Sequence, residues 1–412
     1  MNRWLVVVGA IAIQLALGAI YAWSVFTPKL IAAGWSKVNT QVVFSLGLAF
    51  FAIVMVLAGK KLNSWGPKKL AIRGGMVLGS GYVLAGLVGG TSFPALAILI
   101  GVIGGSGIGL AYVVPIAVGM RWFPDKKGMI TGLAVAGFGF GAMGWVKLAG
   151  AWGHLIANIG LSKTFLIYGI IFAIMVVAGG MVMIFPPKDY KPEGWEPEEA
   201  SQGDGSSVAV ADFESSEMIK TPQFLIIFLT FLFGASAGLM SIGLMKLYPM
   251  EALQANGLSE AAASGIAGTA IAVFFSLANG LGRIGWGTIS DKLGRKTSII
   301  IMSATQGIAV LAFTSMAGSP ALLYLGATII GFNFGGNFAL FPAITADTFG
   351  TKNVGNNYPF VFLSYGVGGI VGPIMGGMLG DMNNFPLAFT ICGISCLIGA
   401  GLTATLKSPK KV

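Results

Sequence analysis

Long apolar runs recur along this chain, and they decide what it can fold into. A helix of about 20 apolar residues crosses the ~30 Å hydrocarbon core of a bilayer. Twelve such runs alternate with short polar turns, at approximately 4–27, 41–59, 70–91, 95–119, 129–151, 163–185, 223–247, 264–288, 297–318, 321–345, 358–380 and 386–406. Over the 412 residues, 55% are hydrophobic and only 10% are charged, which is a membrane composition. We therefore predict an all-α integral membrane protein with twelve transmembrane helices.

The first run follows Met-Asn-Arg, a charged start that a secretory signal peptide would also show. The run is longer than the usual h-region of about 7–15 residues, and it has no convincing A-x-A cleavage site. We therefore expect it to be the first membrane span.

Basic residues are distributed unevenly among the turns, although the net charge of +10 could also suggest a nucleic-acid partner. Cytoplasmic loops of membrane proteins are rich in Lys and Arg. With a cytoplasmic N-terminus, that side of the membrane receives Arg3, Lys60, Lys61, Lys68, Lys69, Arg73, Arg121, Lys126, Lys127, Lys292, Arg295, Lys296, Lys352, Lys407, Lys410 and Lys411. The opposite side receives only Lys29, Lys37, Lys147, Lys163 and Lys246. We predict that both termini are cytoplasmic, and we expect no nucleic-acid binding because these charges form no patch interleaved with aromatic residues.

A single long polar stretch, Pro186 to Gln223, divides the spans six and six. Nine of the fifteen acidic residues fall in it, and its Pro, Gly and Ser content is typical of an irregular linker. We predict an N-terminal six-helix bundle at 1–185, a cytoplasmic central loop at 186–222 and a C-terminal six-helix bundle at 223–412.

The two halves also resemble each other. GKKLNSWGPKK (59–69) follows the second span, and GTISDKLGRK (287–296) follows the eighth. Pro115 lies late in the fourth span and Pro342 late in the tenth. Duplication of a six-span unit predicts two pseudo-symmetric bundles with a substrate site between them near mid-membrane.

These turns resemble the loop signature of the major facilitator superfamily, G-x-x-x-D-K-x-G-R-K, which Gly287 to Lys296 matches. The first copy departs from it, since Asn63 and Ser64 replace the acidic and basic residues. RWFPDKKG (121–128), KTPQF (220–224), NGLGR (279–283) and FALFPAITADTFG (338–350) are similar to the bacterial oxalate/formate antiporter and monocarboxylate transporter branch. The resemblance covers the whole chain and implies a transporter of small carboxylates.

Arg283 is the most informative charge in the sequence, because it lies within the eighth span. An ionised side chain at the bilayer centre costs about 2.5–3.5 kcal/mol on insertion scales. Asp347, at the end of the tenth span, is the only acidic residue near a span interior, so no internal salt-bridge partner is evident. We predict that the guanidinium receives a substrate carboxylate through two parallel hydrogen bonds. The alternative is a side chain that snorkels to the cytoplasmic side or binds backbone carbonyls.

Asn279 precedes Arg283 by one turn and is predicted on the same helix face, either as a substrate ligand or as an interhelical polar contact. The resemblance implies further cavity positions, although each aromatic residue could equally serve helix packing. They are Tyr21 and Tyr112 of the first and fourth spans, Phe138 of the fifth, Phe334 and Phe338 of the tenth, and Phe362 and Tyr365 of the eleventh.

Two departures from the family pattern bear on substrate and coupling. Oxalate/formate antiporters have a lysine in the eleventh span where this sequence has Tyr365, so a single fixed charge predicts a monoanion in preference to a dianion. Eukaryotic monocarboxylate carriers have an aspartate where this sequence has Asn279, which leaves the residue that would carry a proton unidentified.

Few residues in the sequence could support metal binding, catalysis or nucleotide binding. His154 is the only histidine, and Cys392 and Cys396 share the last span with no further ligand type, so we expect no metal, no cofactor and no enzymatic activity. The glycine-rich segments lie inside spans and include no Walker loop, which excludes a nucleotide site of that kind.

The sequence as a whole predicts a secondary transporter of short-chain monocarboxylates, such as lactate or pyruvate, in a bacterial inner membrane. We expect proton symport by alternating access, with the substrate, protons and membrane lipid as partners and a monomeric chain. Anion exchange of the oxalate/formate type is the main alternative. A neutral-solute facilitator and a non-transporting receptor are further alternatives.

Overall fold

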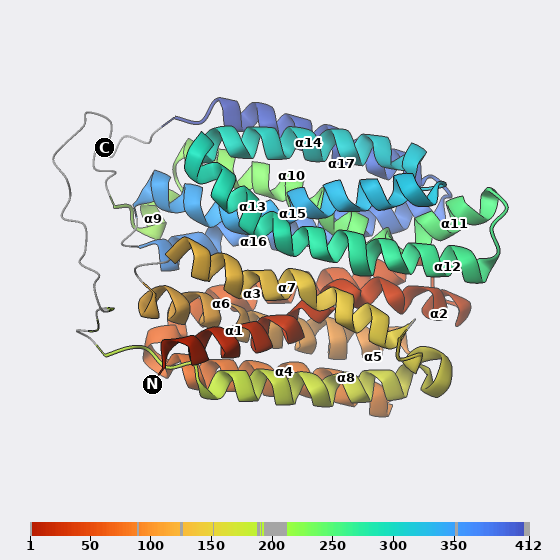
Figure 1. Ribbon diagram of the computed structural model, residues 1–412, viewed down its shortest axis with the longest axis horizontal. Helices are drawn as coiled ribbons and strands as arrows, with labels where there is room; N and C mark the ends of the chain where they lie inside the picture. The colour runs from red at the N-terminus through yellow and green to blue at the C-terminus, as the bar shows by residue number, and fades with distance from the viewer. Residues whose placement is uncertain are drawn as a thin grey trace.

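The fold is entirely helical in the part of the chain that the structure describes (Figure 1). The computed structural model describes residues 2–88, 90–123, 127–150, 152–187, 190, 192, 212–350 and 353–407. Eleven of its helical segments are long and apolar enough to cross a membrane, and α7 contributes a shorter apolar helix, Val135–Ala149. Each of the twelve predicted spans overlaps one of these, which confirms the predicted fold class.

The membrane helices follow one another in the predicted order. They are α1 with η1 (Arg3–Leu17, Gly18–Val25), α3 (Lys37–Trp65), α4 (Pro67–Val88), η2 with α6 (Ala97–Gly104, Gly105–Trp122), α7 (Lys127–Ala149), α8 (Leu155–Met181), α10 (Pro222–Leu244), α12 with η4 and α13 (Glu260–Thr269, Ala270–Phe275, Ser276–Leu293), α14 (Arg295–Met316), α15 (Pro320–Phe349), α16 (Val354–Asp381) and α17 (Phe385–Ala404). Short helices α2 (Thr27–Ala32), α5 (Phe93–Leu96), α9 (Ser215–Met218) and α11 (Leu247–Ala255) join them. The seventh span was expected to reach residue 247 but ends at Leu244, so that Lys246 lies in the turn before α11.

Helices α1 to α8 lie together on one side of the molecule and α10 to α17 on the other (Figure 1). Within each side the helices pack on one another, α4 on α8 in the first and α14 on α17 in the second. Across the two sides, α3 contacts α16 and α7 contacts α13. The domain boundaries at 185 and 222 stay predictions, because residues 193–211 between them lie outside the described residues.

The predicted repeat is visible in the backbone of the two signature turns. Gly66 between α3 and α4 has φ 80° and ψ 150°, and Gly294 between α13 and α14 has φ 80° and ψ 152°. Only glycine adopts a positive φ without strain, so both turns require it. Pro115 lies inside α6 and Pro342 inside α15, as the second sequence echo suggested.

The two signature turns differ in charge, as their sequences predicted. In the second copy, Arg295 pairs with Asp291 at 2.6 Å and with Asp347 at 3.6 Å. In the first copy, Asn63 instead accepts a hydrogen bond from Nη2 of Arg121 at 3.0 Å. Among the described residues, the first turn has a hydrogen bond to a neutral acceptor where the second has ion pairs.

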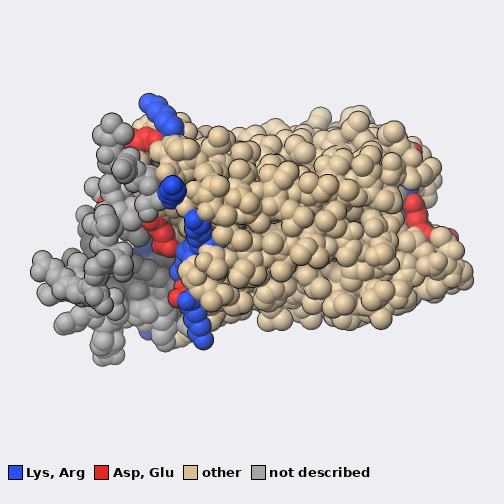
Figure 2. Space-filling view, turned by 90° about the horizontal axis from the view of Figure 1, so that it is seen from above, with Lys and Arg blue, Asp and Glu red and all other residues tan. Residues whose placement is uncertain are grey.

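On the face that Figure 2 shows, charged side chains concentrate at the two ends of the molecule and leave a broad uncharged band between them. Most of the visible Lys and Arg lie at the end that contains the N-terminus, and we call the opposite end the far end (Figures 1 and 2). The cytoplasmic orientation of the termini stays a prediction. Lys126, Lys188, Lys191, Lys352, Lys410 and Lys411 lie outside the described residues.

At the far end, the N-terminus of α3 is bound by the C-terminal end of α16. Backbone N–H groups of Lys37 and Val38 donate to the two carboxylate oxygens of Asp381, at 2.7 and 3.0 Å. Lys37 Nζ also pairs with Glu251 of α11 at 2.7 Å. A carboxylate is favourable at a helix N-terminus because it accepts from unpaired N–H groups and faces the positive end of the helix dipole. These contacts join the two sides of the molecule.

Replacing Asp381 by alanine is expected to weaken this junction. Losing a cap of this kind costs about 1 kcal/mol, so the melting temperature of the detergent-purified protein should fall. Asp381→Asn keeps one acceptor oxygen and should lose less. Equal melting temperatures for the parent and Asp381→Ala would contradict the assignment.

Candidate functional site

Arg283 lies on α13 in the interior of the molecule and is only 1% exposed. Its Nε donates a hydrogen bond to Oδ1 of Asn279 at 3.1 Å, one helical turn earlier. This confirms that the two residues share a helix face. The burial contradicts the alternative in which the side chain snorkels to the cytoplasmic surface.

The two terminal nitrogens of Arg283, Nη1 and Nη2, have no hydrogen-bond partner among the described residues. No recorded ion pair in the described ranges includes Arg283. The guanidinium carbon lies 4.1 Å from the ring centre of Phe338 and 5.6 Å from that of Phe138. Aromatic faces attract a cation but leave its N–H groups unbonded, so both nitrogens remain available to an acceptor.

Tyrosine hydroxyls lie beside this charge. Tyr21 is on η1, a 3₁₀ segment that replaces the end of the first α-helix, and its hydroxyl is 3.0 Å from that of Tyr365 on α16. Tyr21 and Tyr112 both act on Arg283 electrostatically, and their hydroxyls lie close to its guanidinium without the geometry of a hydrogen bond to Nη1 or Nη2. Cationic and neutral hydrogen-bonding groups therefore face the same region.

Aromatic contacts connect the remaining predicted residues. Phe138 lies 5.0 Å from Tyr21 and 5.3 Å from Tyr112 between ring centres. Phe338 lies 5.3 Å from Phe334 and 5.5 Å from Tyr365. Phe362 lies 4.8 Å from Tyr365 and 5.9 Å from Tyr112.

All nine predicted site residues thus form one group, which we call the central cluster: Tyr21, Tyr112, Phe138, Asn279, Arg283, Phe334, Phe338, Phe362 and Tyr365. Each is at most 3% exposed, so the cluster is closed to solvent. Tyr21, Tyr112 and Phe138 come from the first side of the molecule, and the other six come from the second. The cluster therefore lies where the two sides meet.

The sequence analysis missed Phe51 and Phe231. Phe51 on α3 has its ring centre 4.9 Å from Tyr112, 5.3 Å from Phe362 and 5.7 Å from Tyr365. Phe231 on α10 lies 6.0 Å from Phe362. Each sits in a run of other apolar residues, and nothing in those runs separates a phenylalanine that faces the cluster from one that faces lipid.

Glycine allows the two sides to meet beside Asn279. A Cβ added to Gly139 on α7 would lie 2.6 Å from Oδ1 of Asn279, and one added to Gly280 would overlap the ring of Phe140. Side chains at these positions would push α7 away from α13. The glycine-rich segment 136–144 therefore allows close helix approach in this region.

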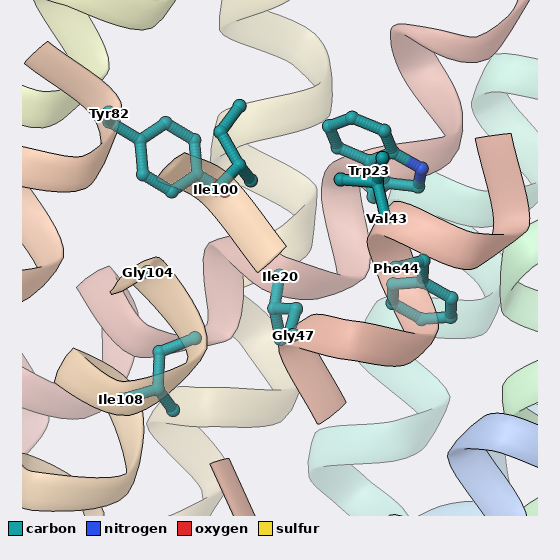
Figure 3. Close-up of a pocket in the computed structure, with 9 residues that line it drawn as sticks. All are labelled: Ile20, Trp23, Val43, Phe44, Gly47, Tyr82, Ile100, Gly104 and Ile108. Carbon is teal, nitrogen blue, oxygen red and sulfur yellow. The ribbon is translucent and has the colours of Figure 1, made fainter. Parts of the chain in front are cut away.

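A small cavity lies next to η1, apart from Arg283 (Figure 3). Its volume is about 10 Å³, enough for a single water molecule, and its walls are mainly apolar. It is lined by Ile20, Trp23, Val43, Phe44, Gly47, Tyr82, Ile100, Gly104 and Ile108. With no cation in its wall, this cavity does not suit an organic anion.

The described residues include no group of three or more His, Cys, Asp or Glu side chains that could hold a metal ion. Cys392 and Cys396 are buried, and Cys392 Sγ lies 3.6 Å from Sδ of Met240. Both thiols belong to the packing of α17.

Comparison with known proteins gives two kinds of match. A family model described as the Major Facilitator Superfamily matches residues 5–276 and 247–412. The uncharacterized MFS-type transporter YhjX of Escherichia coli K12 is 31% identical over 373 residues, covering 90% of this chain and 86% of that protein. The oxalate:formate antiporter of Oxalobacter formigenes is 27% identical over 414 residues, covering 99% and 92%. Apicoplast pyruvate carrier 1 of Toxoplasma gondii is 25% identical over 378 residues, covering 78% and 66%.

Replacing Arg283 by methionine is expected to raise the thermal stability of the ligand-free protein. A buried charge without a partner is costly, and apolar residues of similar volume in place of buried charges can stabilise by about 1–4 kcal/mol. Thermal unfolding of the detergent-purified protein measures the effect. Asn279→Leu should lower stability in the parent, because Nε of Arg283 loses its acceptor, but not in the Arg283→Met background. A strongly destabilised Arg283→Met variant would contradict the unpaired state of the guanidinium.

Proposed function

We propose that this chain, which belongs to the Major Facilitator Superfamily, transports short-chain monocarboxylates such as lactate or pyruvate across a bacterial inner membrane. The chain is a multi-pass membrane transporter of that superfamily. One observation carries the choice of substrate class: Arg283 is buried, and neither of its terminal nitrogens forms a hydrogen bond with another residue that the structure describes. A carboxylate presents two oxygens in the geometry that a guanidinium fork binds best.

The surroundings of Arg283 support a small organic acid. Aromatic rings form the walls of the central cluster and would cover a short apolar tail, while Tyr21, Tyr365 and Asn279 provide hydrogen-bonding groups. Because both sides of the molecule contribute to the cluster, rocking of one side against the other would expose it to one end of the membrane at a time.

A monoanion fits the cluster better than a dianion. Arg283 is the single basic residue among the nine residues of the central cluster. At the position where the resemblance places a lysine in oxalate/formate antiporters, Tyr365 instead faces the hydroxyl of Tyr21 at 3.0 Å. A second carboxylate of oxalate would therefore meet neutral groups, and burying it without a counter-charge would be costly.

We propose proton symport as the mode of coupling. A proton that moves with the anion cancels its charge, which is worth about 2.3 kcal/mol at 100 mV. We also propose cytoplasmic termini, in line with the charge distribution, and a monomeric transporter. The similarity to the oxalate:formate antiporter favours anion exchange as the second candidate function.

The first test is uptake of radiolabelled lactate into proteoliposomes under an inward proton gradient. The parent should accumulate lactate, and dissipating the gradient should abolish accumulation. Arg283→Ala should lower uptake at least about 100-fold, since hydrogen bonds to charged groups are worth about 1.5–3 kcal/mol each and two are lost. Arg283→Lys keeps the positive charge but lacks the two parallel N–H donors of the guanidinium. Its lactate uptake should therefore lie between that of the parent and that of Arg283→Ala. Equal uptake by the parent and Arg283→Ala would overturn the proposal.

The mode of coupling has its own readout. Exchange instead of symport would be established by flux that requires vesicles preloaded with formate or lactate and does not depend on the proton gradient. In that case the role of Arg283 would stand and only the coupling would change.

Tyr365→Lys tests the preference for a monoanion. A second cation opposite Arg283 should improve competition by oxalate for labelled lactate uptake by about tenfold or more, since a charge-assisted hydrogen bond is worth about 1.5–3 kcal/mol. Tyr365→Phe removes the hydroxyl without adding charge and serves as the matched control. If oxalate competes equally poorly in both variants, Tyr365 does not set the charge preference.

A further inference from the structure

Two lysines contact the same helix, α12, at the far end of the molecule. Lys246, in the turn after α10, is 7% exposed, and its Nζ donates to the backbone oxygen of Ser264 and to its Oγ at 2.7 Å. Lys147, in the last turn of α7, donates from Nζ to Oγ1 of Thr269 at 3.2 Å. Ser264 and Thr269 are both on α12, so the two ammonium groups lie along the same helix.

Neither ammonium has a carboxylate partner in the described part of the chain. The acids nearby on other elements are engaged elsewhere: Glu251 pairs with Lys37, and Asp381 binds the N-terminus of α3. Glu260, one turn before Ser264, forms no recorded ion pair with either lysine. Burial, followed by the like charge of Lys147, lowers the pKa of Lys246 to about 8. The two ammonium groups therefore act on each other electrostatically, and no carboxylate of the described residues neutralises them.

The two lysines come from different sides of the molecule. Lys147 ends α7, which belongs to the first side, and Lys246 and α12 belong to the second. The contact between Lys147 and Thr269 thus crosses the same interface that encloses the central cluster. If the far ends of the two sides separate, this contact must break and Lys147 loses its acceptor, whereas Lys246 keeps its bonds to Ser264 within the second side.

We propose that Lys147 and Lys246 form a second anion site, which receives the carboxylate of a small organic acid at the far end before it reaches the central cluster. A lysine ammonium has three N–H donors, of which Lys246 uses two and Lys147 one, so both have capacity for a further acceptor. Gly268 lies under this group: a Cβ there would be 3.3 Å from Nζ of Lys246, so a larger residue would crowd the ammonium. The choice of a carboxylate as ligand rests on the proposed function.

Chemical labelling tests this site without requiring transport. Sealed membrane vesicles of both orientations are treated with the amine reagent trinitrobenzenesulfonate, and modified lysines are identified by mass spectrometry. Sodium lactate should slow modification of Lys147 and Lys246 about threefold or more relative to sodium chloride of equal ionic strength, as expected for a partly shielded charge pair. Lys163 is exposed, belongs to the same predicted face and should be labelled equally in both salts. Arg283→Ala should retain the protection, because the two sites are separate.

Transport kinetics measured separately from each end of the protein provide a second test. In Lys147→Gln/Lys246→Gln, the KM for lactate presented at the far end should rise about fivefold or more, while the KM from the other end stays unchanged. Lys163→Gln is the matched control and should behave as the parent, and similar thermal unfolding would show that the double variant is folded.

The outcomes separate this inference from the proposed function. Lack of lactate flux in the parent would remove the proposed function, and labelling alone would then decide whether the lysines bind a carboxylate. Equal labelling in lactate and chloride would overturn the second site, as would absence of label on both lysines while Lys163 is modified. So would an equal change of KM from both ends.

Discussion

Backbone polar groups cannot bond to water in the hydrocarbon core, and this constraint shapes the whole molecule. Every span therefore satisfies its backbone within a helix, and departures from α geometry are tolerated only where protein covers them. The structure has such departures at η1, which holds Tyr21, and at η4, which directly precedes the helix of Asn279 and Arg283. A third, the π segment η2, contributes Ile100 and Gly104 to the wall of the small cavity beside η1. Irregular backbone thus adjoins the central cluster, in keeping with the frequent association of π segments with functional sites.

Several features were predictable from the sequence because one strong physical cost determines each of them. Apolar run length fixed the twelve helices, and the cost of an intramembrane charge singled out Arg283. The contact between Tyr21 and Tyr365 was not predictable, since those residues are 344 positions apart and nothing local couples them. Phe51 was missed because a phenylalanine in an apolar span has the same signature whether it faces lipid or the site. The 3₁₀ and π segments also could not be predicted from the sequence, since their residues suit an ordinary α-helix equally well.

The two halves of the fold repeat the backbone conformation of the signature turn closely, but they do not repeat its charged contacts. Gly66 and Gly294 share nearly the same dihedral angles, because both turns must reverse the chain after a helix. The ion pairs of Arg295 have only a hydrogen bond between Asn63 and Arg121 as their counterpart. Each of these contacts lies within one half of the molecule: Arg295 joins α14 to α13 and α15, and Arg121 joins α6 to α3. The charge difference therefore affects how each signature turn is stabilised within its own half.

The unpaired charge of Arg283 also bears on how transport is coupled. In an exchange cycle the guanidinium is neutralised by a carboxylate each time the cluster closes. Net symport needs in addition that the empty transporter closes over Arg283, and the cluster contains no acidic residue to compensate the charge at that step. Closing over an unpaired cation is costly, and bonds to Asn279 and contacts with Phe138 and Phe338 offset only part of that cost. In a symport cycle, the return of the empty form would carry this cost, and reorientation of the neighbouring tyrosine hydroxyls toward the guanidinium would lower it.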